Sequence, residues 1–476
     1  MSTKKSKIRF GTDGWRSIIA DDFTFYNVRL VASAIARYLD STEGLKDRGL
    51  LVAYDSRFMA EEFALQVAGV FAAAGIKVYL TAKSTPTPVA AYGVLHLQTA
   101  GAVMLTASHN PPIYMGIKFI PHYAGPAMPR ETDAIVAEIN RAVAAGKEPP
   151  FIDLDHKPEG MEKVELKEAY FQHLAKILDK KKIKASGLRV VVDPMHGAGA
   201  GYLEEFLQGL CRVAVIRSNR DPFFGGGLPD PTLKYLAPLV QAVRLKNADL
   251  GLALDGDGDR LGVVDREGKF YNANTILTMI LYYLVEHKGW RGPVARTVAT
   301  THMLDRIGAG AGLEVLETPV GFKYIGEALR NGAILGGEES GGISISGHVP
   351  EKDGIMTGLL FLEMLAARGL SPAALLQEID AKYGPVANRR IDISCRREEK
   401  AAVLAHILAW NPTTLAGKQV KGINRVDGVK LLLDNSWCLV RPSGTEPVFR
   451  VYLEAPDMGE LDRLEKEVIE ALNLKG

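Results

Sequence analysis

The sequence predicts an α/β protein of several domains. Short β-branched and apolar runs alternate with helical patterns through most of the 476 residues. This alternation is typical of parallel or mixed sheets that carry helices on both faces. At about 100–200 residues per domain, the length allows for three or four domains. Roughly the last hundred residues depart from the alternation and favour an α+β domain.

The elements of the first three blocks follow from apolar patterning. Gly75 closes an apolar-periodic helix, and near-continuous apolar runs on either side indicate buried strands. The first block is predicted to contain the helix 61–75 and the strands 49–56, 76–82 and 101–107. The alternation restarts with strands at 188–193, 212–217 and 248–255 and a helix over 202–209. The most apolar run, 276–285, is too short to span a bilayer and indicates a buried helix.

The domain boundaries are predicted from composition and from changes in pattern. Residues 141–160 carry glycine, a proline pair and charge, which is typical of a linker. The last block is predicted to contain the helices 373–382, 396–409 and 459–472 and the strands 389–394, 429–433, 437–441 and 448–454. We therefore expect three similar α/β domains with mixed or parallel sheets at 1–150, 151–254 and 255–370, and an α+β domain at 371–476.

The charge balance and the cysteines exclude several classes of protein. There are 57 Lys and Arg against 56 Asp and Glu, so no global field would attract nucleic acid or an anionic membrane. We therefore expect neither as a partner. The cysteines, Cys211, Cys395 and Cys438, are far apart and odd in number, which favours a reducing, cytoplasmic location over a disulfide framework. No apolar segment follows the basic N-terminus, so a signal peptide is not expected.

The strongest local motif is LDGDGDR (254–260), in which Asp255, Asp257 and Asp259 follow an apolar strand. Ligands of open α/β sheets bind beyond the carboxyl ends of the strands, and three hard oxygen donors suit Mg²⁺. An EF-hand does not fit, because Arg260 and Arg266 stand where its glycine and its last glutamate belong. Since neighbouring carboxylates repel one another unless they are neutralised, we favour a metal site over a solvated acidic turn.

A second motif, TASHNPP (106–112), places Ser108 and His109 at the end of another apolar strand. No GxSxG motif surrounds any serine, so a hydrolase elbow is excluded. The residue types fit a plain turn as well as an active site. Lys118 follows ten residues after Ser108 and could reach the same place.

Two further loops could bind substrate. In RPSGTEP (441–447), between two strands, Arg441, Ser443, Gly444 and Thr445 could form an anion nest for a phosphate, although a hairpin turn with a surface arginine also fits. In GGEESGG (336–342), the glycines would let the backbone approach a ligand while acidic and hydroxyl side chains bind sugar hydroxyls. Glu338, Glu339 and Ser340 are the candidates, and a plain turn again remains open.

Other nucleotide and protease motifs are excluded. HGAGAGYL (196–203) lacks the third glycine of GxGxxG, the Gly-Lys pairs lack the Ser or Thr of a Walker A motif, and there is no HExxH. The four loops fall one to each predicted domain, which suggests that four domains line one central cleft. A metal-assisted hydroxyl at one end and a phosphate nest at the other indicate phosphoryl transfer on a phosphorylated, hydroxyl-rich molecule.

The ordered set TASHNPP, DGDGDR, GGEESGG and RPSGTEP resembles the α-D-phosphohexomutase superfamily, and FGTDGWR (10–16) fits it as well. The resemblance covers essentially the whole chain. It implies three similar α/β domains and a fourth α+β domain around a central cleft. It also implies an intramolecular phosphotransferase of the isomerase class that acts on a small-molecule hexose phosphate, with one Mg²⁺ per site and hexose 1,6-bisphosphate as activator or intermediate.

The resemblance also implies roles for individual residues. Ser108 would be the phosphoserine, and one of its phosphate oxygens would join the carboxylates of the DGDGDR loop as Mg²⁺ ligands. These carboxylates are Asp255, Asp257 and Asp259. His109 and Lys118 match positions implicated in proton transfer, and Arg260 matches one that supports the transferring group.

The substrate-binding roles come from the same resemblance. The loop of Arg441, Ser443, Gly444 and Thr445 would hold the non-reacting phosphate, Glu338 and Ser340 would contact the sugar hydroxyls, and Arg16 would lie in the cleft near the phosphoserine. This chain departs from many relatives in carrying Gly341-Gly342 where they have Gly-His, and Met115 where they have Asn. The Glu-Glu-Ser core is closer to the glucose-specific branch.

The sequence thus favours a phosphoglucomutase that interconverts glucose 1-phosphate and glucose 6-phosphate, acting as a monomer or homodimer. Phosphomannomutase or dual activity within the same family is the main alternative. A sugar phosphatase of the haloacid dehalogenase type also remains, because DxD follows an apolar strand, although that family normally has Thr or Val where Asp259 stands. A non-catalytic sugar-phosphate binding protein is the third alternative.

Overall fold

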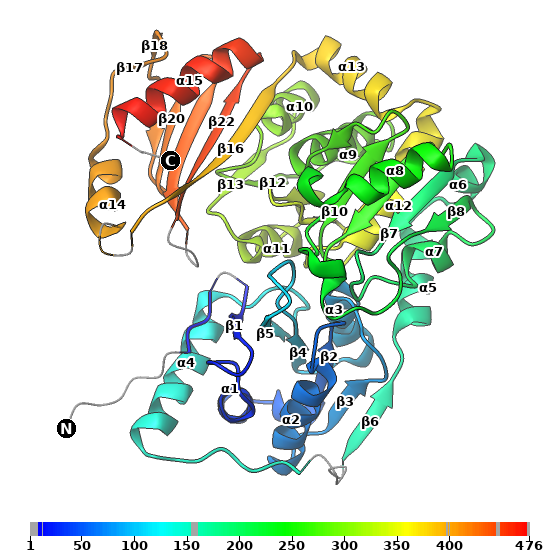
Figure 1. Cartoon of the computed structure of the whole chain (residues 1–476), viewed down its shortest axis with the longest axis vertical. Helices are drawn as coiled ribbons and strands as arrows, with labels where there is room; N and C mark the ends of the chain where they lie inside the picture. The colour runs from blue at the N-terminus through cyan, green and yellow to red at the C-terminus, as the bar shows by residue number, and fades with distance from the viewer. Residues whose placement is uncertain are drawn as a thin grey trace.

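A computed structural model describes residues 8–11, 13–153, 160–396, 398, 400–443 and 448–473. The described chain forms four main sheets and one small hairpin. Figure 1 shows the first sheet and its helices at the bottom, the second and third sheets at the upper right and centre, and the fourth at the upper left. This is the predicted arrangement of α/β units followed by an α+β unit, although the first three sheets are mixed and none is purely parallel.

The first sheet has six strands, and its central strands are buried on both faces. In sheet order they are β1 (Trp15–Ile18), β5 (Tyr114–Pro121), β4 (Gly101–Leu105), β2 (Leu50–Tyr54), β3 (Val78–Thr81) and β6 (Met161–Val164). The helices are α1 (Phe25–Asp40), α2 (Ala60–Ala73), α3 (Thr87–Leu97) and α4 (Pro129–Ala144), with the 3₁₀ turn η1 (Lys46–Arg48). Helix α1 packs on α2 and α4, while α3 packs on β2 and β4. Alternate residues of β2 and β4 therefore enter two different cores.

The second sheet continues beyond the predicted division at residue 254. Its order is β11 (Phe270–Tyr271), β10 (Leu261–Asp265), β9 (Leu250–Leu254), β7 (Arg189–Asp193) and β8 (Arg212–Val215). Strands β9 and β10 are antiparallel neighbours, so the division would separate two hydrogen-bonded strands. Strand β6 likewise lies beyond residue 150 and pairs with β3 of the first sheet. We propose to place these divisions after β6 and after β11.

The helices of the second unit are short. They are α5 (Lys167–Ile177), α6 (Lys180–Ser186), α7 (Leu203–Phe206) and α8 (Ala237–Leu245), with the 3₁₀ turns η2 (Phe224–Gly226) and η3 (Leu233–Tyr235). The helix predicted over 202–209 is the single turn α7. It lies beside the glycines of 197–201, which approach the DGDGDR loop closely: a Cβ at Gly197 would lie 2.8 Å from the Gly256 carbonyl oxygen.

The third sheet is small, with four strands. Its order is β13 (Val315–Thr318), β12 (Val294–Thr297), β14 (Leu335–Gly337) and β15 (Ile343–Ile345). The helices are α9 (Ala273–Glu286), α10 (Met303–Ala311), α11 (Phe322–Arg330), α12 (Gly354–Arg368) and α13 (Pro372–Tyr383). The predicted buried helix 276–285 is α9. One hydrophobic cluster includes Met104 of the first sheet, Leu252 of the second and Leu335 of the third, so these three units share a core.

The fourth unit has a core of its own. Its antiparallel sheet runs β16 (Ala387–Ser394), β22 (Val448–Ala455), β21 (Trp437–Pro442), β20 (Val429–Leu432) and β19 (Gly422–Asn424), beside the hairpin β17 (Thr414–Leu415) and β18 (Lys418–Gln419). Helices α14 (Lys400–Ala409) and α15 (Met458–Ala471) complete it. A small cluster joins Val298 and Ala299 of the third unit to Trp437, Leu439 and Tyr452 of the fourth.

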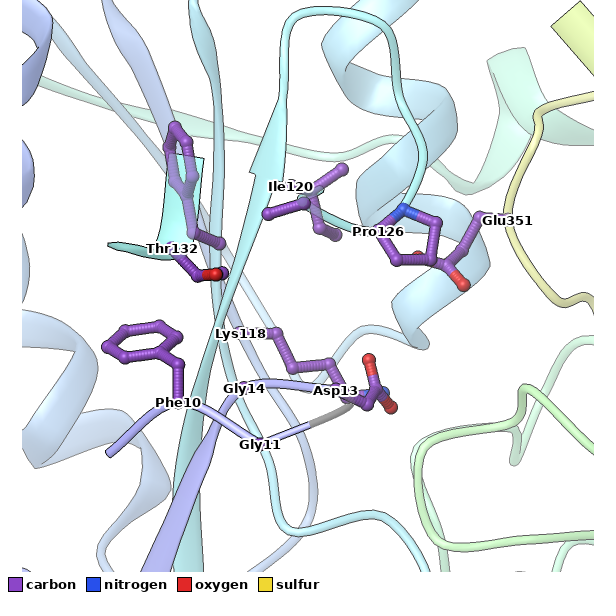
Figure 2. Close-up of a pocket in the computed structure, with 11 residues that line it drawn as sticks. Phe10, Gly11, Asp13, Gly14, Lys118, Ile120, Pro126, Thr132 and Glu351 are labelled. Atoms are coloured by element: carbon purple, nitrogen blue, oxygen red, sulfur yellow. The ribbon is translucent and has the colours of Figure 1, made fainter. Parts of the chain in front are cut away.

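Two features of the whole chain bear on function. Among the described residues, no single helix is long and apolar enough to cross a membrane, and only the pair α12 and α13, bent by 78° at its break, passes that test on length and composition together. Figure 2 shows a small pocket between β5, the segment 10–14 and the segment that precedes α12. Asp13, Lys118 and Glu351 line it, and they lead into the site described next.

Candidate active site

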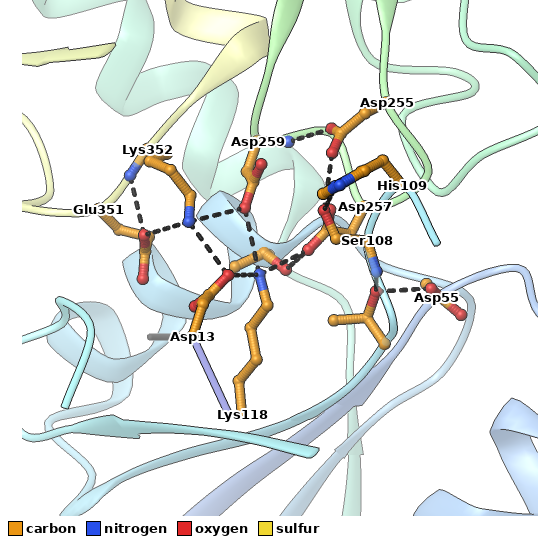
Figure 3. A network of polar contacts seen from close by, with 12 residues as sticks. Asp13, Asp55, Ser108, His109, Lys118, Asp255, Asp257, Asp259, Glu351 and Lys352 are labelled. Carbon is orange, nitrogen blue, oxygen red and sulfur yellow. Dashed lines mark hydrogen bonds and ion pairs between the residues drawn. The ribbon is translucent and has the colours of Figure 1, made fainter. Parts of the chain in front are cut away.

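Ser108 lies where β4 ends, in the loop that returns to β5. Its side chain is buried, and its Oγ donates a hydrogen bond to Asp255 Oδ2 at 2.9 Å. Its φ of +52° is in the left-handed region, which a residue with a Cβ adopts only when its surroundings hold it there. The loop therefore presents one hydroxyl to the second sheet in a defined orientation (Figure 3).

The DGDGDR turn joins β9 to β10 and brings three carboxylates together, as the sequence predicted. Asp255, Asp257 and Asp259 are fully buried, and one possible ligand atom from each lies within 4.8 Å of the others. Gly256 has no room for a side chain, because its Cβ would lie 2.5 Å from the Ser108 carbonyl oxygen. The two loops, 147 residues apart at Ser108 and Asp255, thus pack backbone to backbone.

The charges of the three aspartates differ because their neighbours differ. Burial, followed by repulsion from Asp259 and Asp257, raises the pKa of Asp255 well above its ordinary value. Burial would also raise the pKa of Asp257, but the charge of Lys118 and hydrogen bonds from Lys118 and Thr87 hold it below its usual range. Within the described structure, Asp257 Oδ1 and Asp259 Oδ1 are buried without hydrogen-bond partners. Such oxygens fit a divalent cation.

Lys118 on β5 is the centre of an ion-pair network. Its Nζ lies 2.8 Å from Asp257 Oδ2, 3.1 Å from Asp259 Oδ2 and 2.9 Å from Asp13 Oδ2. Burial would lower its pKa, yet the surrounding carboxylates raise the pKa of Lys118 well above its ordinary value. Lys118 is therefore protonated in this arrangement and donates hydrogen bonds to the carboxylates.

His109, in contrast to Lys118, is in its neutral form. Its Nδ1 lies 3.4 Å from Ser108 Oγ. Burial, followed by the positive charges of Arg260 and Arg16, lowers the pKa of His109 well below its ordinary value. The imidazole is thus neutral and can accept a proton beside the serine.

The two predicted arginines both contact members of the network. The backbone N–H of Arg260 donates to Asp255 Oδ1 at 3.1 Å, and its Nε lies 3.7 Å from Asp259 Oδ1. Arg16 on β1 donates to Asn110 Oδ1 at 2.7 Å and pairs with Asp13 at 3.2 Å. Both guanidinium groups add positive charge near the serine and the carboxylates.

Lys352 and Asp13 also belong to this network, and neither was predicted from the sequence as a site residue. Lys352 Nζ lies 3.1 Å from Asp13 Oδ2 and 3.2 Å from Asp259 Oδ2, and its side chain is buried. The charged run that contains Lys352 precedes α12 and looks in sequence like a solvated helix start. Asp13 lies within the FGTDGWR motif, and that motif was the only sequence feature that pointed to it. The burial of Lys352 between Asp13 and Asp259, two carboxylates 246 residues apart, follows from tertiary packing alone.

The GGEESGG loop connects β14 to β15 and packs against the DGDGDR loop. Glu338 Oε1 accepts a hydrogen bond from the Gly321 N–H at 2.9 Å, and Ser340 Oγ donates to Glu338 Oε2 at 3.3 Å. Burial and repulsion by Glu339 raise the pKa of Glu338 to about 7. A Cβ at Gly341 would lie 3.5 Å from the Arg260 side chain, so the loop borders the charged network.

Gly342 in this loop leaves space for the stem of Lys352. A Cβ at position 342 would lie 2.4 Å from Lys352 Cδ and 2.5 Å from its Cγ. Gly342→Ala should therefore displace Lys352 from Asp13 and Asp259 and lower kcat by about 10–100-fold, because small displacements in an active site have effects of that size. Steady-state kinetics with hexose phosphate check this expectation.

Two controls separate displacement of Lys352 from general damage by Gly342→Ala. Gly422→Ala on β19 adds a Cβ that meets Leu432 only at an ordinary 3.5 Å, so activity should stay unchanged. In a Lys352→Ala background, Gly342→Ala should have little further effect. Fully additive losses in the double variant would contradict the coupling.

The RPSGTEP loop lies between β21 and β22 of the fourth sheet. Arg441 Nε and Nη2 both lie 3.0 Å from Asp427 Oδ2. Ser443 is buried, and its carbonyl accepts a hydrogen bond from Lys400 at 2.8 Å. Gly444 and Thr445 lie outside the described residues. Burial would lower the pKa of Arg441, but Asp427 and, more weakly, Glu339 of the GGEESGG loop raise it.

The four loops are therefore linked in space. The serine loop touches the DGDGDR loop, that loop touches the GGEESGG loop through Arg260, and the charge of Glu339 acts on Arg441. The arrangement holds a buried hydroxyl, a carboxylate cluster that fits a divalent cation, a neutral imidazole and several buried cations. Such a set can hold and transfer a phosphoryl group.

Family models match each of the four units. Phosphoglucomutase/phosphomannomutase α/β/α domain I matches residues 7–145, domain II matches 168–268 and domain III matches 272–383. The C-terminal domain of the same family matches residues 393–471. Together these models cover most of the chain.

Curated relatives and a solved structure agree with these matches. A phosphoglucomutase/phosphomannomutase of Thermococcus kodakarensis is 30% identical over 454 residues, covering 94% of each chain. A probable phosphoglucosamine mutase of Methanopyrus kandleri is 32% identical over 465 residues, covering 97% of each chain. A crystal structure from Thermus thermophilus, assigned as a phosphomannomutase, is 37% identical with a TM-score of 0.85, covering 99% of this chain and 100% of that one.

The names of these relatives differ in the sugar, and the family models leave the sugar open. The four family models and the solved structure agree with the four-unit architecture. The chain therefore belongs to the phosphoglucomutase/phosphomannomutase family of the α-D-phosphohexomutase superfamily and is an enzyme of its isomerase and phosphotransferase class.

Proposed function

We propose that this enzyme interconverts glucose 1-phosphate and glucose 6-phosphate through a phosphoserine at Ser108. The observation that carries the proposal is the buried hydrogen bond from Ser108 Oγ to Asp255, inside a cluster of three carboxylates. A serine that only formed a turn would not need a buried hydroxyl bonded to a carboxylate cluster. A phosphoryl group on its oxygen would lie next to the carboxylates and the surrounding cations.

The chemistry is a phosphoryl transfer in each direction. A hydroxyl oxygen of the sugar phosphate attacks the phosphorus on Ser108, a new P–O bond forms and the bond to Ser108 Oγ breaks. The hydroxyl proton passes to a nearby base, for which the neutral imidazole of His109 is the candidate. Ser108 Oγ takes up a proton in exchange, and Lys118 is the donor that the family resemblance suggests. The hexose 1,6-bisphosphate then turns around, and its other phosphoryl group passes to Ser108 by the reverse steps.

Asp255, Asp257 and Asp259 would hold Mg²⁺ together with an oxygen of the phosphoserine. When bound, Mg²⁺ neutralises charge on the oxygens of the transferring group. Lys118 and Lys352 keep the outer carboxylate oxygens paired, and Arg260 lies beside the same group. This leaves Asp257 Oδ1 and Asp259 Oδ1, the oxygens without hydrogen-bond partners among the described residues, for the cation.

The remaining predicted residues would bind the substrate. Glu338 and Ser340 would contact the sugar hydroxyls, and the loop of Arg441, Ser443, Gly444 and Thr445 would hold the phosphate that is not reacting. Arg16 would add positive charge close to Ser108. The fourth unit has a separate core and a small contact with the third, which would allow it to move while the intermediate turns.

Glucose is favoured over mannose or glucosamine because the Glu-Glu-Ser core is followed by Gly341-Gly342 and no histidine. The expected result is a kcat/KM for glucose 1-phosphate that exceeds those for mannose 1-phosphate and glucosamine 1-phosphate by at least about tenfold. Coupled assays with each sugar phosphate, with Mg²⁺ and traces of the bisphosphate, measure the ratio.

The same assays separate the alternatives. A higher kcat/KM for mannose 1-phosphate would replace this proposal by a phosphomannomutase. Net release of inorganic phosphate, with turnover retained in Ser108→Ala, would indicate a phosphatase that uses an aspartate. Intact mass with phosphate mapped to Ser108 tests the phosphoserine directly.

A further inference from the structure

Arg57 is a fully buried arginine outside the motifs described so far. It lies between β2 and α2, and its guanidinium group has five N–H donors. Four of them donate to the backbone carbonyls of Ser108, Asn110, Pro111 and Tyr114, at 2.5, 2.7, 2.9 and 3.1 Å. The fifth, on Nε, donates to Asp55 Oδ2 at 3.2 Å. Every donor is therefore used: three of the five acceptors belong to the serine loop, and a fourth, the Tyr114 carbonyl, belongs to the first residue of β5.

The other side of Ser108 is held by a second chain of hydrogen bonds that returns to Arg57. The Ser108 N–H donates to Thr106 Oγ1 at 2.8 Å, and Thr106 Oγ1 donates to Asp55 Oδ2 at 2.6 Å. Asp55 in turn accepts from Arg57. Both backbone polar groups of Ser108 are thus held by one connected network, which explains how a residue with a Cβ keeps a φ of +52°.

A segment of the second unit covers Arg57 from outside. The ring of Phe224 lies 4.9 Å from the guanidinium carbon, and Arg220 donates to the backbone carbonyls of Ser56 and Arg57 at 3.3 and 3.2 Å. Water is thereby kept away from the guanidinium group, and in a water-poor site hydrogen bonds are electrostatically stronger. The serine loop is consequently fixed against both the first and the second unit.

We propose that Arg57 is a positioning residue for phosphoryl transfer, which holds the Ser108 loop in the strained conformation that places Oγ at the carboxylate cluster. Arg57 touches neither the carboxylate triad nor the hydroxyl, so it acts through the loop backbone. The inference rests on the proposed phosphoserine at Ser108. It predicts a loss in the rate of Ser108 phosphorylation without a loss in sugar-phosphate affinity, because the GGEESGG and RPSGTEP loops do not contact Arg57 among the described contacts.

The test uses Arg57→Lys in the full chain. Lysine keeps the charge but has three donors, so it cannot serve four carbonyls and Asp55. Dephosphorylated protein is mixed with glucose 1,6-bisphosphate and Mg²⁺, and the phosphate on Ser108 is followed by intact mass. We expect the phosphorylation rate to fall by about 10–100-fold, while the Kd for glucose 6-phosphate changes by less than about threefold.

Two further variants keep the test decisive. Thr106→Val removes the second support at nearly constant volume and should slow phosphorylation in the same way, even if Arg57→Lys folds poorly. Arg48→Lys is the matched control, because Arg48 is an exposed arginine of the first unit that donates to a single carbonyl, that of Gln98; it should leave both rate and affinity unchanged.

The measurements distinguish failure of the positioning role of Arg57 from failure of the proposed function. An unchanged phosphorylation rate in both Arg57→Lys and Thr106→Val, or a rate that falls in parallel with affinity, would overturn the positioning role. A chain that glucose 1,6-bisphosphate cannot phosphorylate even without substitution would overturn the proposed function itself. The unsubstituted protein, measured alongside, distinguishes the second failure from the first.

Discussion

Ser108→Ala should lower turnover of glucose 1-phosphate by at least about 10⁴-fold, because removing the group that forms the covalent intermediate removes the main path of the reaction. The buried Oγ donates to Asp255 and has His109 beside it, whereas the Thr87 hydroxyl, which also bonds to the triad, donates to Asp257. The variant should also carry no phosphate after incubation with glucose 1,6-bisphosphate. Coupled kinetics and intact mass measure the two effects.

Ser108→Ala should leave the fold and the substrate affinity intact, since the serine side chain is small and the phosphate loop lies elsewhere. Ser41→Ala, at the C-terminal end of α1 and far along the chain from the site, is the control and should keep full activity. Turnover that persists in Ser108→Ala would refute the phosphoserine mechanism. If inorganic phosphate were released at the same time, the nucleophile would be an aspartate and not Ser108.

Asp255→Asn should lower turnover by about 10²–10³-fold, since the metal that the triad would hold contributes several kcal/mol of charge stabilisation. The amide keeps the shape of the side chain and its acceptor for the N–H groups of Asp259 and Arg260. The Mg²⁺ concentration needed for half-maximal activity should rise. Titration of activity with Mg²⁺ measures both effects.

The same substitution should not destabilise the metal-free protein. Burial and repulsion by Asp259 and Asp257 raise the pKa of Asp255, so its charged form is disfavoured without a cation, and a neutral amide removes that repulsion. We expect an unchanged or higher Tm without Mg²⁺ and a smaller rise of Tm on adding it. Asp434→Asn, an exposed aspartate paired with Lys421, is the control. Equal Mg²⁺ dependence in Asp255→Asn and the unsubstituted protein would argue against a metal at the triad.

Much of the candidate site could be predicted from local sequence. The apolar pattern of a strand is local, so the sequence alone shows where two strands end. The aspartate triad follows one of these ends and Ser108 follows the other, where ligands of α/β sheets bind. The structure brings Ser108, Asp255, Lys118 and Arg260 together as expected. The division at residue 254 did not follow the sheet, because the antiparallel pairing of β9 and β10 joins residues on both sides of the turn that we took as a boundary.

The class of chemistry follows from local sequence: four loops of defined residue types, in a fixed order, each at the end of a strand. The burial of the charged residues, and their partners, come from tertiary packing. Lys352 contacts Asp13 and Asp259, Gly342 leaves space for the Lys352 side chain, and Arg57 donates to three carbonyls of the serine loop and to that of Tyr114. The charge state and hydrogen bonding of a side chain depend on desolvation and on partners distant in sequence, and no local pattern records either.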